Sequence, residues 1–150
     1  MKKWFSFLLT AMLLLALTAC GSKAQTVTLL SEDAESGIST KYTMEADGDI
    51  VHTITQVTTM DCADFTEEQI DVITESVEQY KAIYAEVDGV TYDVEITETA
   101  MTETIVIDAS NEATMTALSE NNLMPIEGEG AISLEKTVDA MSEQGWTVQK

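Results

Sequence analysis

Few side chains in this sequence combine in a pattern that could perform catalysis. Nucleophilic catalysis needs a serine, threonine or cysteine held beside a base, and His52 is the only histidine in the chain. The sequence contains no G-x-S-x-G elbow and no glycine-rich phosphate loop of the G-x-G-x-x-G or Walker type. Paired carboxylates could support hydrolysis. The chain has 27 acidic residues, however, and nothing in their spacing distinguishes one pair from the others. We therefore expect no enzymatic activity, no catalytic residues and no cofactor.

Two glycine-flanked acidic segments raise the question of a calcium site. These are Asp47-Gly48-Asp49 and Glu127-Gly128-Glu129-Gly130. Neither has the D-x-D-x-D-G-x5-E spacing of an EF-hand loop. Asp47-Gly48 is better explained as a hairpin turn, because both residue types tolerate positive φ. The sequence therefore predicts no metal-ligating residues, and a divalent cation remains an unsupported alternative partner.

The charge of the chain is strongly negative and excludes several partners. The formal net charge is −20, and no arginine is present. Nucleic acids and anionic lipid headgroups would repel such a surface. The absence of arginine also removes the usual bidentate clamp for phosphate or carboxylate ligands. Basic proteins, cationic ligands or divalent cations fit the charge better, although excess acid also serves simply to keep an exported domain soluble.

The amino terminus has the composition of an export signal. Met1-Lys2-Lys3 precedes an apolar run, Trp4 to Leu17, that is too short to cross a bilayer as a stable helix. The run ends in Leu17-Thr18-Ala19-Cys20, which resembles the lipobox of bacterial lipoproteins. The resemblance implies cleavage after Ala19 and attachment of lipid, with palmitate-type chains, to Cys20. The alternatives are an uncleaved signal anchor and a secreted protein with a chance cysteine at this position.

These features divide the chain into three parts. We expect a signal peptide at residues 1–19, a lipidated cysteine and tether at residues 20–36, and one domain at residues 37–150. Within the tether, Val27-Thr28-Leu29-Leu30 could alternatively start a strand. Two or three acyl chains hold a protein durably on a membrane. The protein would then be anchored to the cell membrane or the outer membrane, with its domain outside the cytoplasm. Cys62 is left without an internal disulfide partner, so we expect it to pack in the core as a small apolar residue.

The pattern after the tether first predicts strands and then a helix. Apolar residues alternate from Ile38, Asp47-Gly48 supplies a turn, and residues 50–59 are rich in Ile, Val and Thr, which predicts a hairpin over 38–59 that contains His52. Thr66 and Gln69 then have the spacing of a capping box. The apolar spacing that follows predicts a helix over Thr66–Val87 whose tyrosines, Tyr80 and Tyr84, either pack in the core or line a ligand groove.

The rest of the chain predicts two more strands and two more helices. Residues 90–97 and 102–107 alternate between apolar and polar types, which indicates an antiparallel sheet covered on one side. A short helix over Glu112–Glu120 and a second one over Ser133–Gln144, stopped by Gly145, follow from the apolar spacing. Trp146-Thr147-Val148 is expected to form a final strand or a tail packed on the sheet.

The complete pattern predicts an α+β fold. We expect a single domain with an antiparallel sheet of about four to five strands packed by two main helices. The order of its landmarks resembles the YehR-like bacterial lipoproteins, over roughly residues 38–150. The resemblance rests on the 41–51 strand with its Asp47-Gly48 turn, on Tyr80-Lys81-x-Ile83 before Gly89-Val90, on Tyr92, on the 103–108 strand, and on Met141 to Gly145-Trp146. It implies a compact α+β domain in the cell envelope, and it implies no catalytic or binding residues.

Two functions remain open on the sequence. The first is a protein-interaction or structural component of the envelope, held on the membrane through lipid on Cys20. The second is a small-ligand or cation-binding lipoprotein, which the acidic charge and the Tyr80, Tyr84 and Tyr92 group motivate. A deep, closed cavity lined by those tyrosines would favour the second, and a filled core with one flat apolar patch would favour the first.

Overall fold

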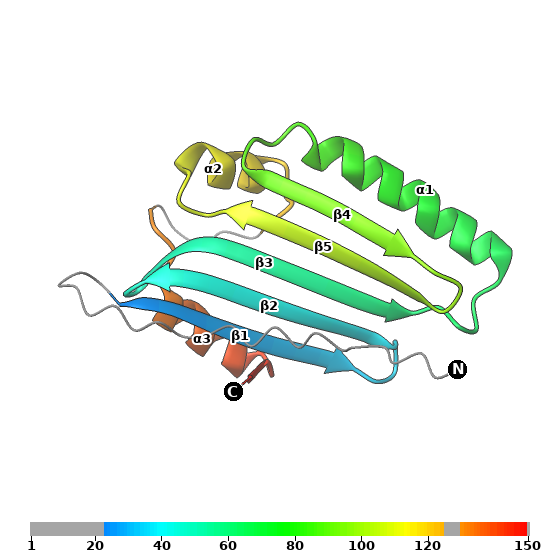
Figure 1. Cartoon of the computed structure of the whole chain (residues 1–150), viewed down its shortest axis with the longest axis horizontal. Coiled ribbons are helices and arrows are strands. Elements are labelled where there is room, and N and C mark those ends of the chain that lie inside the picture. The colour runs from blue at the N-terminus through cyan, green and yellow to red at the C-terminus, as the bar shows by residue number, and fades with distance from the viewer. Residues whose placement is uncertain (1–22, 125–129, 150) are drawn as a thin grey trace, which may run out of the picture.

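The chain folds around one antiparallel sheet. The computed structural model describes residues 23–124 and 130–149. Within them, a six-stranded sheet has the strand order β4-β5-β3-β2-β1-β6, and three helices accompany it (Figure 1). The elements in chain order are β1 (Ala24–Asp33), β2 (Ile38–Asp47), β3 (Ile50–Asp61), α1 (Glu67–Tyr84), β4 (Val90–Ile96), β5 (Ala100–Asp108), α2 (Glu112–Glu120), α3 (Leu134–Glu143) and β6 (Thr147–Val148).

This architecture confirms the predicted α+β class. Every neighbouring pair of strands in the sheet is antiparallel. The predicted hairpin is β2 and β3, and Gly48 in its turn has a φ of 64°, a left-handed conformation that glycine adopts without a steric penalty. The number of strands is six rather than four to five, because β1 adds to the four predicted strands and the expected final strand, β6.

The predicted tether over residues 21–36 is wrong for Ala24–Asp33. This segment forms β1 and pairs with β2 over its whole length. Leu29 is fully buried, and Val27 is half-buried on the same side of the strand. The polar residues that alternate with them made the segment look like a linker, but they lie on the opposite, exposed side of a strand. The domain therefore begins near residue 24 rather than at residue 37.

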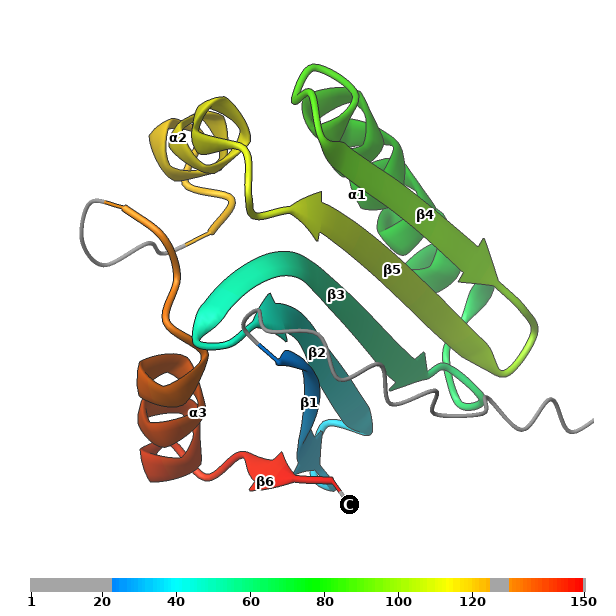
Figure 2. The ribbon, with the colours of Figure 1, turned by 60° about the vertical axis from the view of Figure 1, so that its left-hand side comes forward.

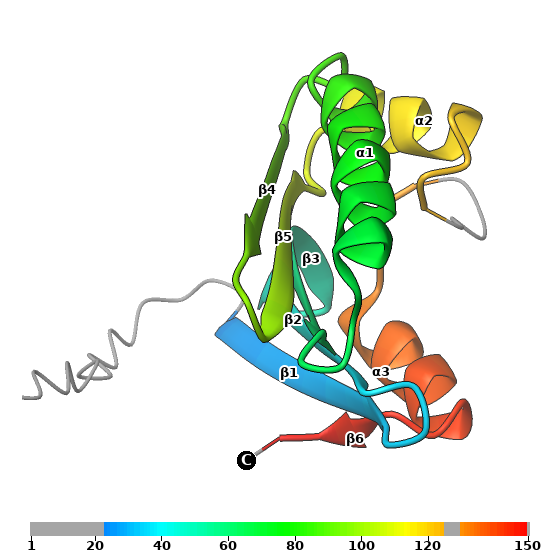
Figure 3. The same cartoon turned by 90° about the vertical axis from the view of Figure 1, so that its right-hand side faces the viewer.

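All three helices lie on one side of the sheet. Figure 3 shows α1, α2 and α3 on the same side, with the other face of the described sheet uncovered. The strand register assigns Leu29, Met44, Ile54 and Ile107 to the covered side, which we call the helix face. The residues that alternate with them form the opposite side, which we call the open face.

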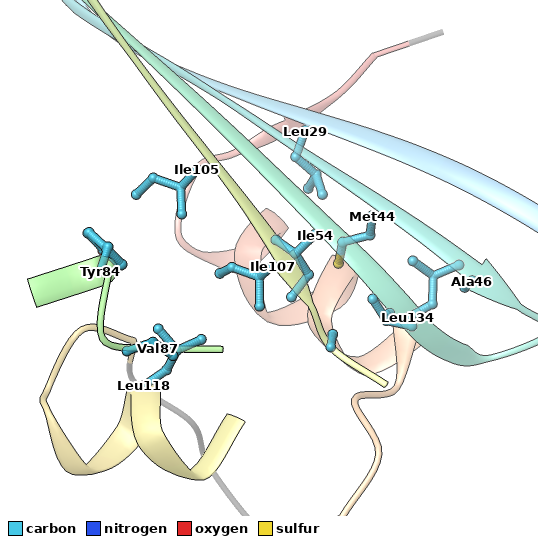
Figure 4. Close-up of a cluster of buried hydrophobic side chains, with 12 residues drawn as sticks. Leu29, Met44, Ala46, Ile54, Tyr84, Val87, Ile105, Ile107, Leu118 and Leu134 are labelled. Carbon is cyan, nitrogen blue, oxygen red and sulfur yellow. The ribbon is translucent and has the colours of Figure 1, made fainter. Parts of the chain in front are cut away.

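The core occupies one end of the helix face. Figure 4 shows Met44 and Ile54 from the sheet together with Leu118 of α2 and Leu134 of α3. Figure 2 shows why the cluster lies there, since α2 and α3 both approach the end of the sheet where β5 finishes and β3 begins. Ile107 completes the apolar row across the central strands. Burial of this cluster is the main source of stability in such a domain.

Helix α1 begins where the sequence predicts, but only its last residue is buried in the core. Thr66 and Gln69 form the expected capping box, which satisfies two backbone N–H groups at the start of the helix. The helix ends at Tyr84, three residues before the predicted end. Tyr84 is buried, whereas Tyr80 remains 50% exposed. Of the two alternatives for the tyrosines, core packing therefore applies to Tyr84, whereas Tyr80 lies at the surface.

The last two helices and the tail agree with the sequence. Asn111 caps α2, and Ser133 caps α3 as expected. Gly145, with a φ of 95°, follows the end of α3 in the left-handed conformation that ends many helices. The ring of Trp146 then packs edge-on against Tyr42, with 6.3 Å between the ring centroids. This contact directs the tail to β1, where Thr147–Val148 form β6.

Candidate functional site

The tyrosine group that could have lined a ligand site is packed against itself. The rings of Tyr84 and Tyr92 stack with centroids 4.8 Å apart. The hydroxyl of Tyr92 donates a hydrogen bond of 2.8 Å to Glu103 Oε1 on the neighbouring strand. Tyr80 lies one turn before Tyr84 on α1 and is half exposed. Two of the three tyrosines therefore stack on each other rather than line a cavity.

The electrostatics of this group favour neutral tyrosines. Burial is the main cause that raises the pKa of Tyr92, and the hydrogen bond and negative charge of Glu103 raise it further. The pKa of Tyr84 is raised by burial and then by the charge of Glu103. Glu103 was not singled out by the sequence. Its position opposite Val94 on a strand pair, with Tyr92 two residues away, is the signal that could have identified it.

Two open depressions mark the helix side of the molecule. One has a volume of about 300 Å³ and lies between the end of α1 and α2, where Ile83, Val87 and Ala117 line it. The other has a volume of about 360 Å³ and lies between β1 and α3, where Val27, Leu134 and Val138 line it. Neither depression is lined by the tyrosines. Small-molecule sites usually enclose most of their ligand, and these depressions are open to solvent.

The open face carries an unusual concentration of threonine. One row across five strands consists of Thr28, Thr43, Thr55, Val106 and Thr91. The Oγ1 atoms of Thr28 and Thr43 lie 3.0 Å apart, which shows that they occupy the same face. Further threonines of this face are Thr26, Thr53, Thr59, Thr102 and Thr104. Threonine favours strands through its β-branched side chain, so the composition builds a polar surface that needs no covering layer.

Asp49 is the acid with the clearest structural role. Its carboxylate accepts hydrogen bonds from the Ser133 hydroxyl at 2.6 Å and from the Glu135 backbone N–H at 2.7 Å. The bond from Glu135 and then the bond from Ser133 lower the pKa of Asp49. The Asp47-Gly48 turn is thus a hairpin turn, as predicted, and the acid after it fixes the start of α3. Proximity in space rather than sequence spacing brings Asp49 and Ser133 together.

The two other reactive residues have structural surroundings. Cys62 is buried, as predicted, and its thiol donates to the Met60 carbonyl oxygen at 3.5 Å. His52 lies within β3, as predicted, and its Nδ1 is 3.0 Å from Thr53 Oγ1. Residue 52 occupies a β-bulge, because Glu45 pairs with Thr53 whereas Ala46 pairs with Val51. Among the described residues, the hydrogen-bond partners of these two side chains are the Thr53 hydroxyl and the Met60 carbonyl, neither of which is a base or an acid.

Several sequence predictions concern residues outside the described part of the chain. These are the signal peptide, Cys20 and the acidic segment Glu127-Gly128-Glu129-Gly130. Among residues 23–124 and 130–149, no three His, Cys, Asp or Glu side chains converge into a group that could hold a metal ion. Within the same residues, no helix has both the length and the apolar composition that a membrane crossing requires.

Comparison with known proteins places the whole domain in one family. A family model described as a protein of unknown function (DUF1307) matches residues 25–147. The match begins at the start of β1, so it includes the strand that the sequence had suggested was a tether. No curated protein matches the sequence.

Two solved structures have the same fold. An NMR structure of a protein from Streptococcus pneumoniae TIGR4 has a TM-score of 0.64 and 15% identity, with 99% of this chain and 98% of that chain covered. The NMR structure of the Escherichia coli YehR protein has a TM-score of 0.65 and 18% identity, with 87% of this chain and 94% of that chain covered. Both confirm the expected YehR-like fold.

Proposed function

Because this chain belongs to the DUF1307 family of proteins of unknown function, we propose a function from its own residues. The protein is a lipid-anchored component of the cell envelope that binds another protein and has no enzymatic activity. The observation that carries the proposal is the Leu17-Thr18-Ala19-Cys20 segment, placed directly before an independently folded domain. Lipid on Cys20 would attach the domain to a membrane from outside the cytoplasm.

The segment that would link the lipid on Cys20 to the domain is short, because β1 begins at Ala24. Cys20 and Lys23 are separated by three peptide units, which span at most about 11 Å, and β1 begins at Ala24. A lipidated Cys20 would therefore hold the start of β1 and the nearby β2–β3 turn close to the bilayer. The far end of the sheet would point away from the membrane, towards other envelope proteins.

The surface of the domain favours binding a protein over enclosing a small ligand. The tyrosine rings are stacked, and Tyr92 is already hydrogen-bonded to Glu103. Within the described residues, the open face is a broad polar surface without a covering helix (Figure 3), and it is not the apolar patch that would have favoured protein binding most directly. Small ligands need concave sites that enclose them, whereas both depressions on the helix side are open to solvent.

The anchor is tested by a Cys20→Ser variant of the full chain in bacterial cells. We expect the wild-type protein to incorporate labelled palmitate and to sediment with membranes. The variant should lose the label and either remain unprocessed or leave the membrane. Cys62→Ser is the matched control, because it removes the other cysteine while a serine hydroxyl can still donate to the Met60 carbonyl.

The outcomes separate the two halves of the proposal. Labelled, membrane-bound Cys20→Ser protein would refute the lipid anchor. Chemical cross-linking of the wild-type protein at the membrane should capture a specific envelope protein. A saturable rise in melting temperature with calcium, magnesium or a polyamine, surviving raised salt, would instead support the small-ligand alternative.

A further inference from the structure

We propose that the free edge of β4 binds an extended, basic segment of a partner protein as an additional strand. The inference rests on the proposed binding function and gives it a site and a partner chemistry. Among the described residues, β4 is the last strand of the sheet and pairs only with β5. Strand addition at such an edge supplies backbone hydrogen bonds for affinity and side-chain pairs for specificity.

The phase of the β4–β5 ladder identifies the groups that an added strand would use. The Asp108 N–H donates to the Gly89 carbonyl at 2.8 Å, and the Thr97 N–H donates to the Ala100 carbonyl at 2.8 Å. Odd-numbered residues of β4 therefore direct their backbone groups towards β5. Tyr92, Val94 and Ile96 direct theirs outwards, and within the described residues these outward groups have no hydrogen-bond partner.

The opposite edge of the sheet, at β1, is partly covered by another strand. There the Gln149 N–H donates to the Thr28 carbonyl at 2.8 Å, and the Thr147 hydroxyl donates to the Leu30 carbonyl at 3.2 Å. The chain's own tail, β6, thus covers the middle of the β1 edge. An uncovered edge is a template for pairing with another strand, and β4 is the longer uncovered stretch of the two edges.

Helix α1 lies over the place that an added strand would occupy. Figure 1 shows α1 displaced outwards past β4. Ile70, Ile73 and Val77 on its apolar stripe are only half-buried, although β4 is the strand that the helix contacts most. A new strand beside β4 would place its inward side chains beneath this stripe. Apolar residues at those positions would bury surface that β4 alone leaves exposed.

The charges around the edge specify the other side chains of the partner strand. Asp93 and Glu95 of β4 point to the open face, and both are exposed. The adjacent helix α1 carries Glu67, Glu68, Asp71, Glu75 and Glu78 against one lysine, Lys81, whose Nζ lies 3.9 Å from Glu78. Opposite charges on directly facing strand residues stabilise a pair, and like charges destabilise it. The partner strand should therefore alternate lysine or arginine with apolar residues.

The same rule disfavours a second copy of this chain as the occupant. Antiparallel pairing of two β4 strands centred on Val94 would place Asp93 opposite Glu95 on both sides of the centre. The two copies would also each carry a net charge of −20. Self-association through this edge is therefore opposed by repulsion, both locally and overall.

The test uses the full chain in detergent and a capped synthetic peptide of about seven residues, the length of β4, that alternates lysine with valine. We expect saturable binding that slows hydrogen exchange of the Tyr92, Val94 and Ile96 amides in NMR spectra. A peptide of the same composition with its lysines and valines in separate blocks should not produce this protection, because it loses the alternation between the two faces.

Two variants and one matched control separate edge binding from general charge attraction. Val94→Pro removes an outward donor without removing a β4–β5 hydrogen bond, and it should abolish amide protection. Asp93→Lys combined with Glu95→Lys should weaken the lysine peptide about tenfold and favour a glutamate–valine peptide. Glu32→Lys combined with Glu45→Lys makes the same charge change on the open face at β1 and β2, and it should leave binding within about twofold.

Three results would overturn the proposal. They are equal weakening by the two double variants, protection of amides elsewhere than on β4, and a concentration-dependent dimer that Val94→Pro abolishes, which would identify a second copy as the occupant. These results do not depend on lipid at Cys20. A cross-linked envelope partner that contacts a different surface would leave the proposed function standing while refuting the β4 site.

Discussion

The two faces of the sheet use the same strands for opposite purposes. Ile54 on the helix face is buried, whereas its neighbour Thr55 lies in the threonine row of the open face. The first face binds three helices through apolar side chains, and the second carries hydroxyl groups and needs no covering element. The difference indicates that stability is concentrated on the helix face, so the partner that we propose would contact parts of the described sheet that contribute little to folding.

The largest expected effect comes from emptying the core on the helix face. Ile54→Ala should lower the free energy of unfolding by about 2–5 kcal/mol, because it removes buried apolar atoms and leaves a cavity beside Met44 and Ile107. Urea unfolding measures the change. Ile50→Ala on the same strand is the control, since Ile50 is 57% exposed and should cost less than about 1 kcal/mol. Equal losses would mean that the core does not lie on the helix face.

The second effect concerns the hydrogen bond that fixes α2 to the turn before β4. The Thr114 hydroxyl is buried and donates to the Asp88 carbonyl at 2.7 Å. Thr114→Val keeps the shape but leaves that carbonyl without its donor, so unfolding should become easier by about 1–3 kcal/mol. Thr116→Val, at an exposed position of the same helix, should change little. An unchanged Thr114→Val protein would show that water replaces the hydroxyl at Asp88.

Local patterns predicted most of this architecture, and contacts distant in sequence account for what they missed. The capping box at Thr66 and the turn at Gly48 are local signals, and both were confirmed. Most of β1 was predicted as a tether, because only a short apolar run within it indicated a strand and only pairing with β2 distinguishes the whole segment from a linker. Sequence spacing could not show that Asp49 caps α3, because 84 residues separate it from Ser133. It also could not show that α1 extends past β4.

The third effect is a dependence of stability on pH through Asp49. Its pKa is lowered in the folded protein, chiefly by the Glu135 N–H and then by the Ser133 hydroxyl. A lowered folded pKa means that the carboxylate's contribution is present above its ordinary pKa of 3.8 and disappears as the pH falls through the folded value. The Asp49→Asn protein should therefore lose less stability than wild type between about pH 6 and about pH 2. Melting curves across this range measure the difference.

The Asp49 result also has an internal control. Ser133→Ala removes one of the two donors, so its melting temperature should fall with pH less steeply than that of wild type and more steeply than that of Asp49→Asn. Identical slopes for wild type and Asp49→Asn would show that the hairpin turn and α3 are not coupled through this carboxylate. The start of α3 would then depend on the Ser133 cap alone.

The smallest effect is expected on the open face. Thr43→Val removes the contact between the hydroxyls of Thr43 and Thr28 at 3.0 Å but keeps the β-branched shape that suits a strand. Its free energy of unfolding should stay within about 0.5 kcal/mol of wild type. Such a neutral result, beside the large loss at Ile54, would confirm that the two faces differ in what they contribute to folding. A loss comparable to that of Ile54→Ala would instead require a covering layer on the open face, and that face would then be unavailable to a partner.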